Sequence, residues 1–145
     1  MAPPVLDAAR TSTNMEEKPL LYPENQSIRI LIVEDDPVYR RSLYKALTGA
    51  GYRVFTAANG LEAMEFLTQL KFSLILFDVK RPYQGGLDDL KTILRFAGES
   101  KIVVMTTFNE NSLKNKVLQM GARDFLVKPI RKAALLNSIA KTLRG

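Results

Sequence analysis

Apolar and polar positions alternate in two patterns from residue 28 to the end of the chain. Short segments rich in apolar and β-branched residues predict strands, and longer segments with apolar residues at helical spacing predict helices. The predicted strands cover residues 28–33, 52–56, 73–78, 101–106 and 124–127. The predicted helices cover residues 38–50, 61–70, 87–97, 110–120 and 130–143. The order (βα)5 predicts an α/β fold with a five-stranded parallel sheet, doubly wound by helices on both faces.

The first 27 residues lack this periodicity. They hold four of the seven prolines and few large apolar residues, so we expect a flexible N-terminal extension over residues 1–27. Residues 28–145 fit one domain, since domains have roughly 100–200 residues. The chain begins without the basic start and apolar stretch of a secretory signal, and no segment approaches the ~20 apolar residues of a membrane span. We therefore expect a cytoplasmic protein without a membrane partner.

The composition restricts the chemistry that the chain can perform. Apolar residues make up 46% and charged residues 25% of the sequence, which is typical of a soluble globular protein. The chain has no cysteine and no histidine, which excludes disulfides, thiolate nucleophiles, zinc–thiolate sites and imidazole general bases. Any chemistry must therefore use carboxylates, lysine, threonine or a hard cation such as Mg²⁺.

The formal net charge is +6, and it is unevenly distributed. Residues 1–27 carry two basic and four acidic side chains, whereas residues 28–145 carry 19 basic and 11 acidic ones. A basic domain attracts nucleic acids, acidic proteins or phosphorylated partners. No run of lysine and arginine exceeds two residues, however, and no aromatic residues are interleaved with one. Nucleic-acid binding is thus not supported beyond the charge itself, and a solvated basic surface is the plainer interpretation.

Polar side chains gather where the predicted strands end. Glu34 and Asp35 follow the first strand, Asp78 ends the third, Thr106 ends the fourth and Lys128 follows the fifth. Ligand sites of open α/β sheets lie outside the carboxyl ends of the strands. Neighbouring carboxylates repel one another, so this arrangement requires a cation, which Lys128 and a bound Mg²⁺ would supply. The pattern indicates phosphate chemistry with an aspartate nucleophile.

Other α/β sites lack their residues here. No G-x-G-x-x-G motif follows the first strand, and no G-x-x-x-x-G-K-[ST] motif is present, which argues against a dinucleotide site and a P-loop. A flavin mononucleotide site would need a loop of glycine and hydroxyl residues after the first strand. The acidic loop found there would repel a free phosphate.

With these motifs in order, the sequence resembles the receiver domain of bacterial two-component response regulators over residues 28–145. The resemblance rests on the sequences at residues 30–37, 74–78 and 121–129 and on Thr106 after an apolar strand. It implies a flavodoxin-like receiver fold. It also implies that Asp78 takes a phosphoryl group from the phosphohistidine of a sensor histidine kinase or phosphotransfer protein. Glu34, Asp35 and Asp78, with the backbone carbonyl of Lys80, align with the ligands of Mg²⁺.

The resemblance assigns three further roles. Lys128 aligns with the residue that pairs with the phosphoacceptor and then with the phosphoryl oxygens. Thr106 aligns with the hydroxyl that moves onto the phosphoryl group, and Phe125 with the aromatic switch residue that rotates inward. Phosphorylation adds about −1.5 to −2 charge, and it would bias a two-state surface. That surface is formed by the helix at residues 110–120, the strand at 124–127 and the helix at 130–143.

The loop after Asp78 departs from the family pattern. Methionine is usual at the third and sixth positions after the phosphoacceptor, where this chain has Arg81 and Gln84, although Pro82 and Gly86 are retained. Lys80 occupies the second position, which neighbours the phosphoryl group. One interpretation is a solvated basic loop. The other is that Lys80 and Arg81 attract an anionic donor or interact with the phosphoryl group and change its lifetime. The sequence does not say whether that lifetime becomes longer or shorter.

We interpret the chain as a signalling receiver that assists its own phosphorylation and dephosphorylation without turning over an external substrate. A binding module that acts by its surface alone, with a rarely phosphorylated site, is the alternative. An aspartate-nucleophile phosphatase would need a second aspartate two residues after Asp78, where Lys80 stands. The kinase, the stimulus, the output, an effector domain or downstream partner, and the oligomeric state are left open.

Overall fold

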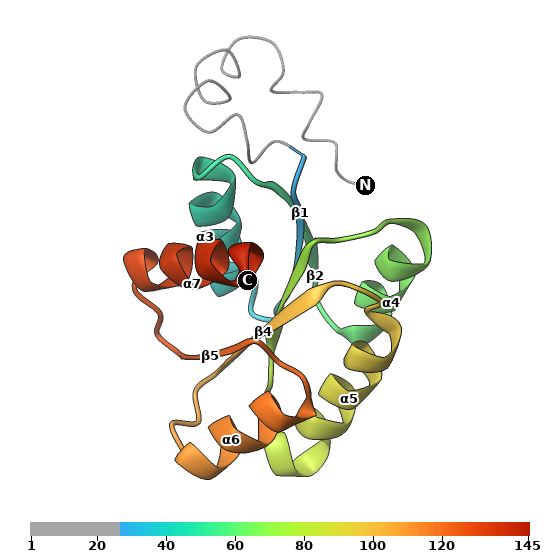
Figure 1. Cartoon of the computed structure of the whole chain (residues 1–145), viewed down its shortest axis with the longest axis vertical. Helices are drawn as coiled ribbons and strands as arrows, with labels where there is room; N and C mark the ends of the chain where they lie inside the picture. The colour runs from blue at the N-terminus through green and yellow to red at the C-terminus, as the bar shows by residue number, and fades with distance from the viewer. Residues whose placement is uncertain (1–26) are drawn as a thin grey trace, which may run out of the picture.

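The computed structural model describes residues 27–145, so the extension predicted for residues 1–27 lies outside the described residues except for Ser27. Strands and helices alternate along the whole of this range (Figure 1). The five strands are β1 (Arg29–Val33), β2 (Arg53–Ala57), β3 (Leu74–Asp78), β4 (Lys101–Thr106) and β5 (Asp124–Val127). Every neighbouring pair is parallel, in the order β2-β1-β3-β4-β5. The predicted five-stranded parallel sheet is confirmed.

Helices cover both faces of the sheet. They are α3 (Pro37–Gly49), α4 (Gly60–Gln69), α5 (Leu87–Phe96), α6 (Asn111–Met120) and α7 (Lys132–Arg144). Alternate residues of each central strand point to opposite faces, which divides the core in two. On one face, Ile32, Leu76 and Met105 pack with residues of α3 and α7. On the other face, Leu31, Ile75 and Val104 pack with residues of α4, α5 and α6, so the doubly wound arrangement is confirmed.

Local residue chemistry sets the beginnings of the helices that border the site. The Asp36 side chain accepts a hydrogen bond from the Val38 backbone N–H, and Pro37 occupies the first turn of α3. The Asn59 side chain caps α4 in the same way, through the Glu62 backbone N–H. The last helix begins at Lys132 and not at residue 130, because the backbone of Arg131 is still extended.

The segment predicted as an irregular loop after β3 contains a short π-helical turn, η3 (Pro82–Gly86). Arg81, directly before it, has a positive φ of 42°, a conformation that costs a non-glycine residue about 1–2 kcal/mol. Gly86 closes the turn, and a Cβ atom built there would lie 2.1 Å from the carbonyl oxygen of Lys80. Only glycine allows this close approach, so Gly86 helps to fix the backbone beside the end of β3.

Candidate functional site

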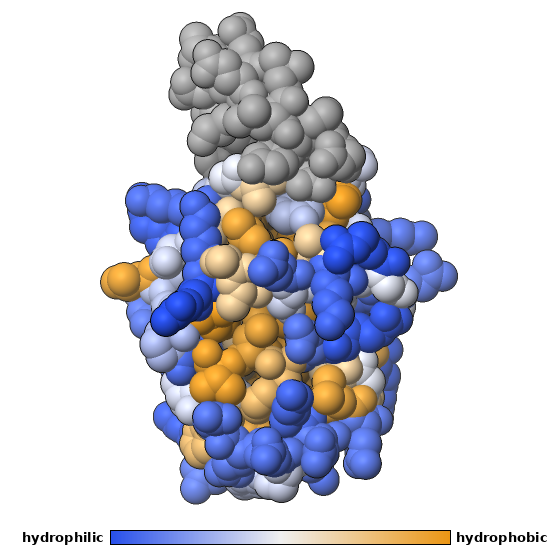
Figure 2. Space-filling model, turned by 60° about the vertical axis from the view of Figure 1, so that its left-hand side comes forward, coloured by the Kyte–Doolittle hydropathy of each residue, from blue (hydrophilic) through white to orange (hydrophobic). Residues whose placement is uncertain are grey.

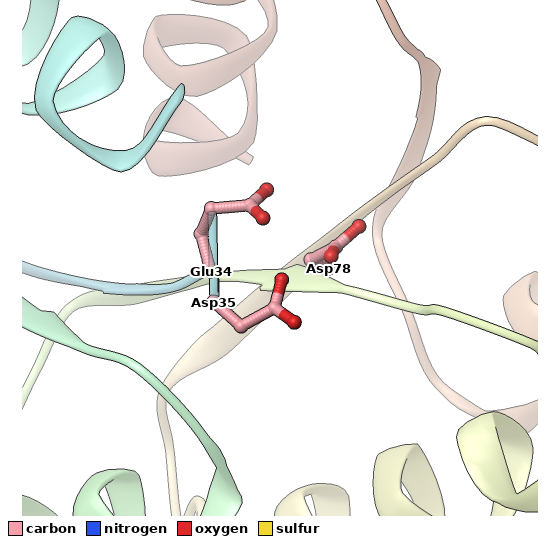
Figure 3. Close-up of side chains that lie close together, drawn as sticks. All are labelled: Glu34, Asp35 and Asp78. Atoms are coloured by element: carbon pink, nitrogen blue, oxygen red, sulfur yellow. The ribbon is translucent and has the colours of Figure 1, made fainter. Parts of the chain in front are cut away.

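Three carboxylates meet at the carboxyl edge of the sheet. Glu34 and Asp35 directly follow β1, and Asp78 is the last residue of the neighbouring strand β3. Figure 3 shows the three side chains gathered where these strands end. Each offers a carboxylate oxygen within 4.8 Å of the others. The convergence predicted from the strand ends is confirmed for these three residues.

Lys128 joins two of these carboxylates from the end of β5. Its Nζ atom lies 2.6 Å from Glu34 Oε1 and 3.0 Å from Asp78 Oδ1. The contact is largely shielded from water, since the side chains of Lys128, Glu34 and Asp78 are 13%, 0% and 5% exposed. The structure thus brings Lys128 to the position that the sequence predicts.

Burial and charge set the protonation of this group. Loss of hydration and repulsion from Glu34 raise the pKa of Asp78 to about 6, against the opposing hydrogen bond from Lys128. Burial disfavours the ammonium of Lys128, but its hydrogen bonds to Glu34 and Asp78 outweigh that cost and raise its pKa. Lys128 therefore stays charged, and the ionisation of Asp78 is hindered.

The first turns of α3 hold Glu34 and Lys128 in place. The second carboxylate oxygen of Glu34 accepts the backbone N–H of Asp36 at 3.1 Å, and Arg40 donates to the Glu34 backbone carbonyl at 2.9 Å. The Lys128 ammonium lies over the Tyr39 ring, with Nζ 4.7 Å from the ring centroid. Sequence reasoning did not single out Tyr39 or Arg40. The signal in the sequence was their position about one helical turn after Glu34 and Asp35. The first turn of a helix that begins at Pro37 lies next to the end of β1.

Lys80 contacts the third carboxylate. Its Nζ atom donates to Asp35 Oδ2 at 2.7 Å, and both side chains are about half exposed, at 53% and 50%. The hydrogen bond from Lys80 lowers the pKa of Asp35, and the same bond raises the pKa of Lys80. Both residues line a pocket of about 160 Å³ with Glu34, Asp78 and Asp89. This contact was not predicted.

Thr106 is the last residue of β4, and the hydrogen bonds of its hydroxyl within the described part of the chain go to backbone groups. It is fully buried, and its hydroxyl donates to the Val79 carbonyl at 2.9 Å and accepts the Phe108 backbone N–H at 3.2 Å. The sequence places this hydroxyl at the site. In this structure the hydroxyl is bonded to backbone on both sides, and one partner is the carbonyl of Val79, the residue directly after Asp78. Its move onto a phosphoryl group stays a prediction.

Phe125 is already inside the protein. It is 8% exposed and belongs to the core that includes Val104, Leu113 and Val117. The family resemblance implies that Phe125 rotates inward on phosphorylation. In this structure the ring is already inward, so a change of its position would move it outward.

The edge strand β5 exposes apolar side chains between two helices. Leu126 and Val127 are half-buried, and Leu118 of α6 is 36% exposed. Figure 2, which brings the side of α7, β5 and α6 forward, shows apolar residues gathered between polar ones.

Among the described residues, no helix combines the length and apolar character that crossing a membrane requires.

Comparison with known proteins agrees with this geometry. Residues 30–140 match the family described as the response regulator receiver domain. The chain is 32% identical to the chemotaxis protein CheY of Thermotoga maritima over 114 residues, which cover 78% of this chain and 95% of CheY. It is 34% identical to the transcriptional regulatory protein ZraR of Klebsiella oxytoca, of which the match spans only 27%.

Solved structures show the same fold. A CheY-like receiver domain protein from Methanospirillum hungatei superposes with a TM-score of 0.72 at 30% identity, covering 81% of this chain and 94% of that one. A two-component response regulator from Clostridium difficile gives a TM-score of 0.74 at 27% identity, covering 81% and 97%. The match spans most of this chain and the acidic site lies within it, so the chain belongs to the response regulator receiver domain family of two-component signalling.

Proposed function

We propose that this receiver domain, over residues 28–145, accepts a phosphoryl group on Asp78 from the phosphohistidine of a sensor kinase or phosphotransfer protein. The observation that carries the proposal is the Lys128 ammonium, which lies 3.0 Å from Asp78 and 2.6 Å from Glu34 at the carboxyl edge of the sheet. A carboxylate oxygen of Asp78 attacks phosphorus, the bond from phosphorus to the donor nitrogen breaks, and the donor imidazole keeps the electron pair. Phosphoryl transfer needs positioning and charge neutralisation above all.

The donor set suits Mg²⁺. Hard carboxylate oxygens of Glu34, Asp35 and Asp78 lie within 4.8 Å of one another, and Mg²⁺ favours a few carboxylates together with waters and a phosphate oxygen. Both oxygens of Glu34 already accept hydrogen bonds, and Asp35 is the most exposed of the three carboxylates. The backbone carbonyl of Lys80 would complete the ligand set that the family resemblance implies. Bound Mg²⁺ would neutralise charge on the phosphoryl oxygens, and Lys128 would hold another of them.

The response would begin at Thr106. Its hydroxyl must leave the Val79 carbonyl and the Phe108 N–H before it can bond a phosphoryl oxygen. Since Phe108 lies in the segment between β4 and α6, this exchange would loosen that segment and alter the surface of α6, β5 and α7 with Phe125. That surface would then favour a different downstream partner or effector domain. The domain acts on its own phosphorylation state and turns over no external substrate.

The test is the intact mass of the protein after incubation with acetyl phosphate and Mg²⁺. We expect a single phosphoryl adduct in the parent, none in Asp78→Asn and none when EDTA is present. Asp89→Asn is the matched control, because Asp89 lines the same pocket but lies outside the acidic cluster; this variant should be phosphorylated like the parent. No adduct in a folded protein that binds Mg²⁺ would overturn the proposal in favour of a module that acts by its surface alone.

A further inference from the structure

Lys80 places a positive charge inside the pocket proposed for the metal ion. Its ammonium lies 2.7 Å from Asp35 Oδ2 and lines the same pocket as Glu34 and Asp78. Its charge is also attracted by both of those carboxylates. The Lys80 ammonium thus lies in the pocket that is proposed to bind a divalent metal ion.

Asp35 is the carboxylate most open to an incoming ion. Lys128 contacts Glu34 and Asp78, whose side chains are 0% and 5% exposed, whereas the Asp35 side chain is 50% exposed. Among the described residues, Asp35 is also the member of the cluster that Lys128 leaves without an ion pair. Lys80 therefore occupies the oxygen that a cation arriving from solvent would meet first.

We propose that the Lys80 ammonium competes with the divalent cation for Asp35, so that binding of the ion requires Lys80 to swing away. This inference rests on the metal site of the proposed function and deepens it by naming what sets the affinity of that site. The Lys80 side chain is 53% exposed, so its long stem has solvent into which it can move. An exposed ion pair contributes only about 0–1 kcal/mol, which makes Lys80 a competitor that the ion can displace.

Calorimetric titration of Mg²⁺ into the metal-free full chain, with no phosphoryl donor present, measures this competition directly. Lys80→Gln keeps the backbone carbonyl but removes the ammonium. We expect it to bind Mg²⁺ about three- to tenfold more tightly than the parent, the range set by an exposed ion pair and by the Coulomb energy of charges near 4 Å in water.

Two control variants remove the same unit of charge without touching Asp35. Arg81→Gln changes the next residue of the loop, and Lys114→Gln changes an exposed residue of α6. Both should bind Mg²⁺ within about twofold of the parent, because among the described residues neither side chain forms an ion pair with the three carboxylates, and exposed charges are screened. An equal increase in Mg²⁺ affinity in Lys80→Gln and Arg81→Gln would show that only the net charge matters, and it would overturn the inference.

A second measurement follows the lysine side chain itself. In spectra of the parent with labelled lysine side chains, the signal absent from Lys80→Gln should shift as Mg²⁺ is added, as its ammonium leaves Asp35. Unchanged affinity in Lys80→Gln together with an unmoved signal would overturn the inference while leaving the metal site intact. Failure of every variant and of the parent to bind Mg²⁺ would instead overturn the metal site of the proposed function, and this inference with it.

Discussion

Two lysines form ion pairs with the acidic cluster, and they differ in their exposure to water. Lys128 comes from the end of β5, is 13% exposed and bonds two carboxylates that are almost fully buried. Lys80 comes from the segment before η3, is 53% exposed and bonds one carboxylate that is half exposed. The first contact belongs to the interior of the domain, and the second belongs to its surface.

The difference shows which part of the site the fold fixes. Removing one partner of a buried ion pair leaves an unpaired charge without water, so Lys128 cannot be replaced without affecting the whole cluster. An exposed pair is screened by solvent and contributes little, so Lys80 can change the properties of the site while the fold stays the same. We therefore expect Lys128 to determine whether Asp78 can be phosphorylated. We expect Lys80 to adjust the affinity for Mg²⁺ and the lifetime of the phosphoryl group.

The largest effect should come from Lys128→Gln. Loss of a preorganised positive group at the transferring phosphoryl should slow phosphorylation by acetyl phosphate about 10²- to 10³-fold, as removal of one oxyanion-stabilising group does in enzymes. Initial rates from intact mass spectra measure this. The matched variant Lys80→Gln should stay within about tenfold of the parent, and equal losses in the two variants would contradict the distinction between the buried and the exposed side.

The next largest effect concerns Thr106, on the buried side. Thr106→Val keeps the shape of the side chain but leaves the Val79 carbonyl and the Phe108 N–H without their partner, at a cost of about 1–3 kcal/mol in the free energy of unfolding. Urea denaturation measures the change. Thr106→Ser retains the hydroxyl and should lose less. A Val variant as stable as the parent would show that these hydrogen bonds do not hold the segment before α6.

The third effect is a pH dependence. In the metal-free protein the pKa of Asp78 is about 6, above its ordinary value of about 3.9 in an unfolded chain, so the folded state binds the additional proton. Stability should therefore fall as pH rises from about 4 to 6, by about 1–2 kcal/mol after allowance for solvent screening. Asp78→Asn should lack this part of the slope in urea denaturation at several pH values. The same slope in both proteins would assign it to another group.

The smallest effect should be on the lifetime of the phosphoryl group. Lys80 lines the pocket beside Asp78, so its ammonium can stabilise phosphoryl oxygens and limit the access of water. Lys80→Asn should lose the phosphoryl group faster, by up to about fivefold, the range of an exposed charge contact. Decay of the adduct after removal of the donor measures the rate. Equal or slower decay would place Lys80 outside the path of the attacking water.

Most of the site on the Lys128 side could be predicted from the sequence. Apolar strands that end in Glu34, Asp78 and Lys128 bring those side chains to one edge once the strands are parallel, because strand direction alone decides which ends meet. The helix cap at Asp36 follows from residue type in the same way. These features depend on pattern and residue chemistry, which the sequence contains.

The Lys80 side depended on backbone geometry that no pattern encodes. The ion pair between Lys80 and Asp35 exists because of the course of the chain between β3 and η3, where Arg81 has a positive φ and Gly86 approaches the Lys80 carbonyl. The present partners of the Thr106 hydroxyl, the Val79 carbonyl and the Phe108 backbone N–H, likewise depend on distances that the sequence does not specify. Side-chain partners of this kind are settled by tertiary packing.

The central claim is that Asp78 receives the phosphoryl group, and locating that group tests it most directly. Borohydride reduction converts an aspartyl phosphate to homoserine, which peptide mass spectrometry can assign to one position. After treatment with acetyl phosphate and Mg²⁺, we predict homoserine at residue 78 and unmodified side chains at Glu34 and Asp35. Reduction at either of those residues, or at none, in protein that is folded and binds Mg²⁺, would contradict the account.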